Sequence, residues 1–133
     1  MQDFKKLRVW QKAHTLTLDV YRISQSFPKE ELYGLVSQMR RCAVSIASNI
    51  AEGSRRGTDP ELSRFLRIAL SSACELDYQV LLSFDLRYLN KEEFKKLSDS
   101  LTHIKKMLIA FITSIDAHAQ TPKAKNKQPK AKS

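Results

Sequence analysis

The chain has 133 residues, of which 42% are apolar and 28% charged, and its formal net charge is +9. This length supports one domain with a substantial core and excludes two. No apolar run approaches the roughly 20 residues that span a bilayer, and the first residues lack the apolar stretch of a secretory signal, so we expect a cytoplasmic protein without a membrane partner.

The low glycine content and the lack of runs that alternate apolar and polar residues predict an all-α domain. The first helix should occupy residues 9–26, where apolar side chains recur at heptad spacing and form one seam. Pro28 ends this helix, because its ring disfavours the helical conformation of the preceding residue and removes a backbone donor. The seam consists of Val9, Ala13, Leu16, Val20, Ile23 and Phe27.

The second helix should occupy residues 34–54 and combine an apolar stripe with many polar side chains. Amides, hydroxyls and charges of both signs fill its other sides, so we expect these groups to have partners. Gly53 and Gly57 bracket a C-terminal cap and a short loop. The apolar stripe comprises Leu35, Met39, Cys42, Ile46, Ile50 and Gly53.

The third helix should occupy residues 60–88, with Asp59 as its N-cap and Pro60 as its first residue. Apolar side chains surround most of its circumference, whereas a four-helix bundle covers only one side of each member. This surplus apolar face predicts a subunit interface, because a monomer would expose a large apolar patch.

The fourth helix should occupy residues 91–117, and Asn90 with Glu93 predicts a capping box at its start. Its apolar side chains lie on one side only, and polar side chains occupy the opposite face, as in an amphipathic helix. They are Phe94, Leu97, Leu101, Ile104, Leu108, Phe111 and Ile115. Residues 1–121 are therefore predicted to form one four-helix bundle domain.

The last twelve residues, 122–133, carry five lysines and no acid, so the rest of the chain keeps a net charge of only +4. Such a composition cannot bury a core and predicts a disordered Lys-rich tail. The tail either adds electrostatic affinity for polyanions or simply keeps the chain soluble.

If the second and third helices form a hairpin that turns near Gly57, residues whose numbers sum to about 116 lie side by side. We interpret the complementary partners that result as polar pairs that fix the register of the hairpin. The alternative, a pair of catalytic carboxylates, is disfavoured because Glu52 and Glu75 would lie many turns apart. The predicted pairs are Arg41 with Glu75, Asn49 with Arg67, and Glu52 with Arg64.

The same hairpin brings the two cysteines, Cys42 and Cys74, close together. Their spacing does not match a metal site, and a cytoplasmic protein keeps its thiols reduced. We expect two buried thiols that pack as small apolar side chains, with a redox-sensitive pair as the alternative.

Four arginines near the second loop form the candidate nucleic-acid-binding site: Arg55, Arg56, Arg64 and Arg67. Guanidinium groups match the geometry of phosphate oxygens, and helix starts favour anions. An ordinary solvated surface is the competing interpretation. No spacing brings together a nucleophile, a base and an orienting group, and the histidines are isolated. We therefore expect no enzymatic activity, no catalytic residue, no metal, no cofactor and no small-molecule substrate.

Several short motifs follow one another in order between residues 4 and 115. They are Leu7-x-Val9-Trp10-Gln11-Lys12-Ala13, Tyr21, Phe27-Pro28, Glu31-x-Tyr33-Gly34-Leu35, Gln38-x-Arg40-Arg41, Ser45-Ile46, Asn49-Ile50-Ala51-Glu52-Gly53, Phe65-Leu66-x-Ile68-Ala69, Ser72-x-x-Glu75-Leu76 and Leu86-x-Tyr88-Leu89. In combination they resemble the four-helix-bundle protein family encoded in intervening sequences of bacterial 23S ribosomal RNA genes.

This resemblance implies an antiparallel up-down-up-down bundle that assembles into a ring-shaped homopentamer. The family is also similar to the accessory proteins of diversity-generating retroelements, which are basic pentamers that bind a reverse transcriptase and nucleic acid. Our leading hypothesis is therefore a non-enzymatic homo-oligomer that binds RNA or other nucleic acid through a repeated basic surface. The alternative is a protein-interaction scaffold, for example an accessory subunit of a retroelement reverse transcriptase.

Overall fold

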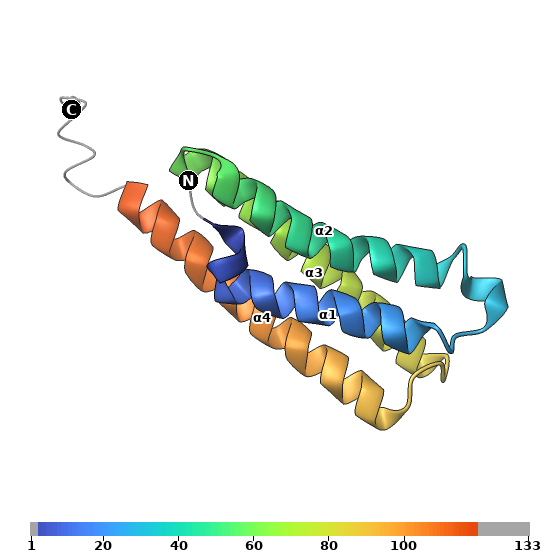
Figure 1. Ribbon diagram of the computed structural model, residues 1–133. Coiled ribbons are helices and arrows are strands. Elements are labelled where there is room, and N and C mark those ends of the chain that lie inside the picture. Colours follow the sequence, from blue (N-terminus) through green and yellow to red (C-terminus); the bar gives the residue numbers. More distant parts are fainter. Residues whose placement is uncertain (1–2, 120–133) are drawn as a thin grey trace, which may run out of the picture.

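The computed structural model describes residues 3–119, which form four long α-helices and two short 3₁₀ turns and contain no strand. The helices are α1 (Arg8–Ser24), α2 (Leu35–Arg55), α3 (Asp59–Asp85) and α4 (Lys91–Ala119), and the turns are η1 (Phe4–Lys6) and η2 (Lys29–Glu31). Figure 1 shows the helices side by side in an elongated bundle, with loops that join consecutive helices at alternating ends. The all-α prediction is confirmed, and each predicted helix overlaps an observed one. The predicted Lys-rich tail, residues 122–133, lies outside the described residues.

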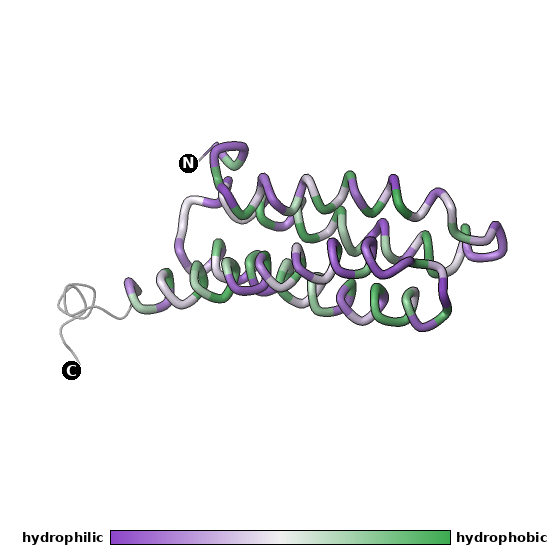
Figure 2. The backbone as a smooth tube through the Cα atoms, turned by 90° about the horizontal axis from the view of Figure 1, so that it is seen from below, coloured by the Kyte–Doolittle hydropathy of each residue, from purple (hydrophilic) through white to green (hydrophobic). Residues whose placement is uncertain are grey.

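The apolar seams predicted from the sequence form the core of this bundle. Every predicted seam residue of α1 and of the stripe on α2 is buried, and five of the seven on α4 are buried as well. Figure 2 shows the same pattern as hydrophobic and hydrophilic stretches that alternate along each helix. Each fully buried large side chain contributes about 1.5–3 kcal/mol to folding. No helix within residues 3–119 is both long and apolar enough to cross a membrane.

The four helices differ in how much apolar surface they leave exposed. α3 exposes Ile68, Tyr78 and Leu81, which are more large apolar side chains than any other helix exposes. α1 exposes Leu18 and Tyr21. The surplus apolar surface predicted for the third helix is therefore present, although several of its members are half-buried against the core.

The helix starts match the predictions in one case and differ in another. Asn90 and Glu93 form the predicted capping box, in which each backbone N–H donates to the other residue's side chain, at 3.0 and 2.8 Å. α3 begins one residue earlier than predicted, because Thr58 is extended and its hydroxyl accepts the backbone N–H of Glu61 at 3.4 Å. Asp59 is thus the first helical residue and not the N-cap.

α2 and α3 approach each other closely at Gly53. A Cβ atom at this position would lie 3.0 Å from Cβ of Phe65 and 3.1 Å from Cδ1 of Leu62. α2 continues past Gly53 as far as Arg55. The lack of a side chain at Gly53 therefore permits helix packing.

The predicted polar pairs between α2 and α3 do not form. Asn49 donates from Nδ2 to the carbonyl of Ser45 on its own helix at 2.8 Å, and Arg41 and Glu75 line one groove without an ion pair between them. Other partners take their place, because acids on the same helix or on α4 reach these arginines: Arg64 pairs with Glu61 and Arg67 with Asp116. A polar contact across α2 and α3 is instead made by the hydroxyls of Ser45 and Ser72, which lie 2.8 Å apart.

The cysteine prediction is correct for Cys42 and wrong for Cys74. Cys42 is buried and lines the groove between α2 and α3, whereas Cys74 is exposed and lines a groove between α3 and α4. Both are free thiols. Cys74 follows the fully buried Ala73 and lies on the side of α3 that faces α4, so the two thiols occupy different faces of the bundle.

Candidate nucleic-acid interface

The four predicted arginines gather at one end of the bundle, where α2 ends and α3 begins. Arg55 is the last residue of α2, Arg56 follows it in the loop, and Arg64 and Arg67 lie on the first turns of α3. η1 packs against the same end of α2, so the N-terminal turn belongs to this surface.

Three of these four arginines are held by carboxylates. Arg56 places Nε 3.1 Å from Oε2 of Glu52, and Arg64 places Nη2 3.2 Å from Oε1 of Glu61. Arg67 pairs with Asp116 of α4. All three arginine side chains remain about half exposed, and exposed pairs contribute only about 0–1 kcal/mol. The acids lower the positive charge of this surface below what the arginines alone would give.

Phe65 orders two of the paired arginines. The Cζ atoms of Arg56 and Arg64 lie 5.1 and 4.4 Å from the centre of its ring. A guanidinium group over an aromatic face is attracted to it and loses little freedom when it binds a further anion. Phe65 therefore presents both groups at the surface.

Arg55 has no carboxylate within 4.0 Å in the part of the chain that the structure describes. Its Cζ atom lies 5.6 Å from the centre of the Phe4 ring. Phe4 meets the edge of Trp10 at a centroid distance of 5.0 Å, and the His14 ring lies parallel to Trp10, also at 5.0 Å. We call Arg55, Phe4, Trp10 and His14 the aromatic row.

Sequence reasoning missed the aromatic row. From the sequence alone, neither Phe4 nor Trp10 is assigned to a binding site, and the histidines, His14 among them, are isolated. Only the separation of Trp10 and His14 by one helical turn was a usable signal. The contacts of Phe4 with α1 and α2 depend on how η1 folds back onto the bundle.

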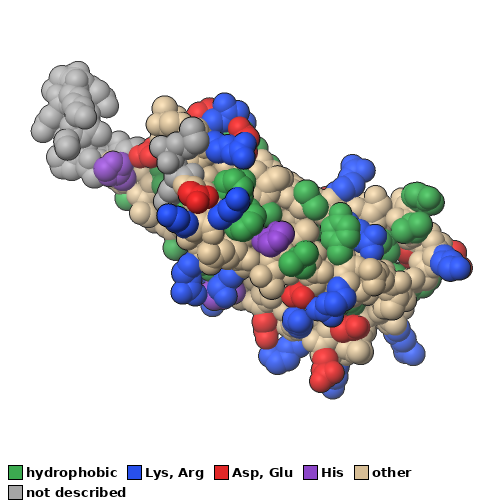
Figure 3. Space-filling view, viewed as in Figure 1, with side chains coloured by type: hydrophobic (Ala, Val, Ile, Leu, Met, Phe, Trp, Pro, Cys, Tyr) green, Lys and Arg blue, Asp and Glu red, His purple; other side chains and the backbone are tan. Residues whose placement is uncertain are grey.

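Further cations flank the aromatic row. Lys5 and Lys6 of η1 are exposed, and neither forms an ion pair within residues 3–119. Figure 3 shows Lys and Arg side chains gathered over this end of the molecule. The arrangement combines aromatic rings with cations that have no carboxylate partner in the described part of the chain.

The polar groove between α2 and α3 does not contain an activated nucleophile. Burial, followed by the Glu75 carboxylate, raises the pKa of the Cys42 thiol above its ordinary value. Since the thiolate is the reactive form, Cys42 is an inert core thiol. Among residues 3–119 no three His, Cys, Asp or Glu side chains gather in a way that would hold a metal ion.

These features define an all-α bundle protein with a cationic, aromatic surface at one end. The chain belongs to the 23S rRNA-intervening sequence protein family, whose model matches residues 5–110. This confirms the resemblance found in the sequence motifs. Comparison with curated proteins gives no match.

A solved structure shares this fold. It is the crystal structure of a protein with unknown function from the S23 ribosomal protein family of Bacteroides thetaiotaomicron. The two chains are 24% identical, the match covers 79% of this chain and 95% of the other, and the TM-score is 0.73. At this identity the likeness concerns the fold alone.

Proposed function

We propose that this protein is a non-enzymatic homo-oligomer that binds RNA or other nucleic acid through the aromatic row and the cations around it. The observation that carries the proposal is the row of Arg55, Phe4, Trp10 and His14 beside Lys5 and Lys6, which form no ion pair within residues 3–119. Single-stranded nucleic acid is bound by this combination, because bases stack on aromatic faces while cations neutralise the backbone.

Each member of the row has a role in this proposal. The exposed imidazole of His14 offers a ring face on which a base can extend the stack begun by Trp10. Arg55 and the lysines of η1 bind the neighbouring phosphates. Arg56, Arg64 and Arg67 contribute less, because a phosphate must first displace their carboxylates.

We further propose that the subunits form a closed ring. The family resemblance implies that this ring contains five subunits. A ring requires two different contact surfaces on each subunit. The α1–α2 side exposes Leu18, Tyr21 and Val44, and Figure 3 shows hydrophobic side chains over these helices. The opposite side, formed by α3 and α4, exposes Tyr78 and Leu81. One side can therefore pack against the other in the next subunit.

Repetition around the ring would strengthen weak contacts. If each subunit binds even about two phosphates, several subunits on one strand give tight binding with a steep dependence on salt. This favours a long single strand over a short duplex as the ligand.

Charge reversal distinguishes the arginines of this surface. We expect Arg55→Glu to weaken the binding of a fluorescently labelled single-stranded RNA about tenfold at low salt, as measured by anisotropy. Arg56→Glu should cost less, since Glu52 already neutralises Arg56. Lys91→Glu, at the start of α4 near the opposite end of the bundle, is the matched control and should have little effect. An equal loss of RNA affinity in Arg55→Glu and Lys91→Glu would show that binding depends only on the net charge of the protein.

A protein-partner scaffold is the second candidate. Tyr33 is 92% exposed and Leu32 is 46% exposed, and both lie in the connection between α1 and α2, far from the aromatic row. Exposed aromatic side chains are typical anchors of protein interfaces. This function gains support if RNA binding is absent at low salt in a correctly assembled protein.

A further inference from the structure

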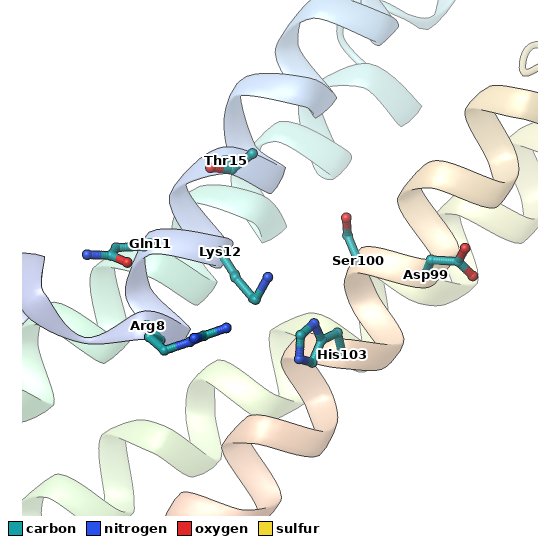
Figure 4. Close-up of a pocket in the computed structure, with 7 residues that line it drawn as sticks. All are labelled: Arg8, Gln11, Lys12, Thr15, Asp99, Ser100 and His103. Atoms are coloured by element: carbon teal, nitrogen blue, oxygen red, sulfur yellow. The ribbon is translucent and has the colours of Figure 1, made fainter.

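A groove of about 500 Å³ lies between α1 and α4, and no residue of the aromatic row lines it. This volume falls within the range of small-molecule sites, roughly 300–1,000 Å³. Figure 4 shows the residues that line it. They are Arg8, Gln11, Lys12 and Thr15 from α1, and Asp99, Ser100 and His103 from α4.

Three basic side chains converge in this groove. Arg8 and Lys12 lie one turn apart on α1, and His103 faces them from α4; Figure 4 shows the nitrogen atoms of all three directed into the space between the helices. Neither Arg8 nor Lys12 has a carboxylate within 4.0 Å in the described residues. The groove is therefore lined by two cations, Arg8 and Lys12, that form no ion pair with any acid of the described chain.

The one acid of the groove does not offset these charges. Asp99 pairs with Lys95 at 2.8 Å, and Figure 4 shows its carboxylate turned away from Arg8 and Lys12. Like charges one helical turn apart repel each other, and α1 has no acid in its first turn to compensate for Arg8. The repulsion between Arg8 and Lys12 is unfavourable, and a bound anion would reduce it.

We propose that this groove is an anion site that binds a phosphate group. The guanidinium of Arg8 can hold two phosphate oxygens, and the ammonium of Lys12 and an imidazole N–H of His103 can reach the same group from the other sides. The hydroxyls of Thr15 and Ser100 supply neutral donors at the rim. The phosphate belongs either to a free nucleotide or to the backbone of a nucleic acid held by the ring.

Inorganic phosphate tests the site without any nucleic acid. In the full chain at constant ionic strength, phosphate should shift the backbone amide signals around Arg8, Lys12 and His103 in a saturable manner. The double variant Arg8→Gln with Lys12→Gln should bind at least about tenfold more weakly. Lys29→Gln with Lys91→Gln removes the same charge near the other end of the bundle and should leave the phosphate affinity unchanged. Equal weakening in both variants, or shifts confined to other regions, would overturn the proposal.

A second variant provides a control in case the double variant does not fold. His103→Gln retains a donor but lacks the imidazole ring, and we expect it to weaken phosphate binding several-fold while the circular dichroism spectrum stays native. An unchanged affinity in this variant, together with a folded Arg8→Gln, Lys12→Gln protein that still binds phosphate, contradicts the site.

Two further ligands identify the source of the phosphate. One outcome is that a nucleoside monophosphate binds more tightly than inorganic phosphate only when Arg8 and Lys12 are present. If the double variant Arg8→Gln with Lys12→Gln abolishes this difference in affinity, the ligand is a free nucleotide. If only a single-stranded RNA gains affinity from Arg8 and Lys12, the backbone is the source. Arg55→Glu should leave the binding of inorganic phosphate in the groove unchanged, so failure of the aromatic row and failure of the groove are distinguishable.

Discussion

Tyr88 connects two loops at the end of the bundle opposite η1. Its hydroxyl donates to Oε2 of Glu31 at 3.0 Å, and Oε1 of the same carboxylate accepts the backbone N–H of Leu35 at 3.4 Å. Glu31 thus joins the α3–α4 loop to the start of α2. The hydrogen bond to Glu31, followed by desolvation and the carboxylate charge, raises the pKa of Tyr88 above its ordinary value of 10.0.

Because the pKa of Tyr88 is raised in the folded protein, the contribution of this hydrogen bond to the stability of the fold depends on pH. The contribution is fully present below the ordinary pKa of tyrosine and is lost as the pH rises through the folded-state pKa. We therefore expect Tyr88→Phe to lower Tm at pH 7, and the difference from the natural protein to shrink once the pH exceeds 10.0. Thermal unfolding followed by circular dichroism at several pH values measures both. A difference that stays constant across this range would contradict the role of the phenol.

Individual arginines show where sequence reasoning ends. The sequence placed Arg55, Arg56, Arg64 and Arg67 together, but it could not distinguish the one that lacks an acid. Arg67 pairs with Asp116, which lies 49 residues further along the chain, so its partner depends on how α4 packs against α3. The apolar seams were predictable because helical periodicity is a local property.

The contact between α2 and α3 depends on Gly53. Alanine normally favours a helix over glycine by about 1 kcal/mol, but a new Cβ here would meet Cβ of Phe65, which is fixed to the backbone of α3. We expect the steric cost to exceed the gain, so Gly53→Ala should lower the free energy of unfolding by about 1–3 kcal/mol.

Gly57 provides the control for this substitution. A Cβ atom at Gly57 would have no neighbouring atom within 4 Å, and the backbone there does not require glycine. Gly57→Ala should be neutral or stabilise the fold by up to about 1 kcal/mol. Urea unfolding of both variants measures the contrast. A Gly53→Ala variant as stable as Gly57→Ala would mean that the two helices can move apart without cost.

The residues that cap α3 and α4 show which helix ends can be predicted from neighbouring residues in the sequence. The capping box of α4 was predictable because both partners lie within four residues. At α3 the predicted cap, Asp59, is wrong by one residue, because Thr58 has the extended backbone of an N-cap and its hydroxyl accepts the N–H of Glu61. The predicted α2–α3 pairs were wrong because an arginine can pair with an acid on its own helix or on another helix, as Arg64 and Arg67 do.

The proposed assembly of the bundle into a ring rests on its exposed apolar side chains. Leu81 is 45% exposed on the α3–α4 side, and Leu32 is 46% exposed in the loop at the end of the bundle. We expect Leu81→Glu to reduce the molar mass in solution to that of a single chain, because a buried charge in the contact is strongly unfavourable. Leu32→Glu should leave the assembly intact. Light scattering after gel filtration measures the mass, and a natural protein that is monomeric at micromolar concentration would contradict the ring.

Binding at the aromatic row can be observed through its own fluorophore. Trp10 is the only tryptophan of the chain, so its emission reports on this surface alone. Titration with a single-stranded RNA should change the emission in a saturable manner, and the apparent Kd should rise with added salt and in Arg55→Glu but not in Lys91→Glu. An RNA that binds by anisotropy yet leaves the Trp10 emission unchanged would place the nucleic acid elsewhere and contradict the proposed interface.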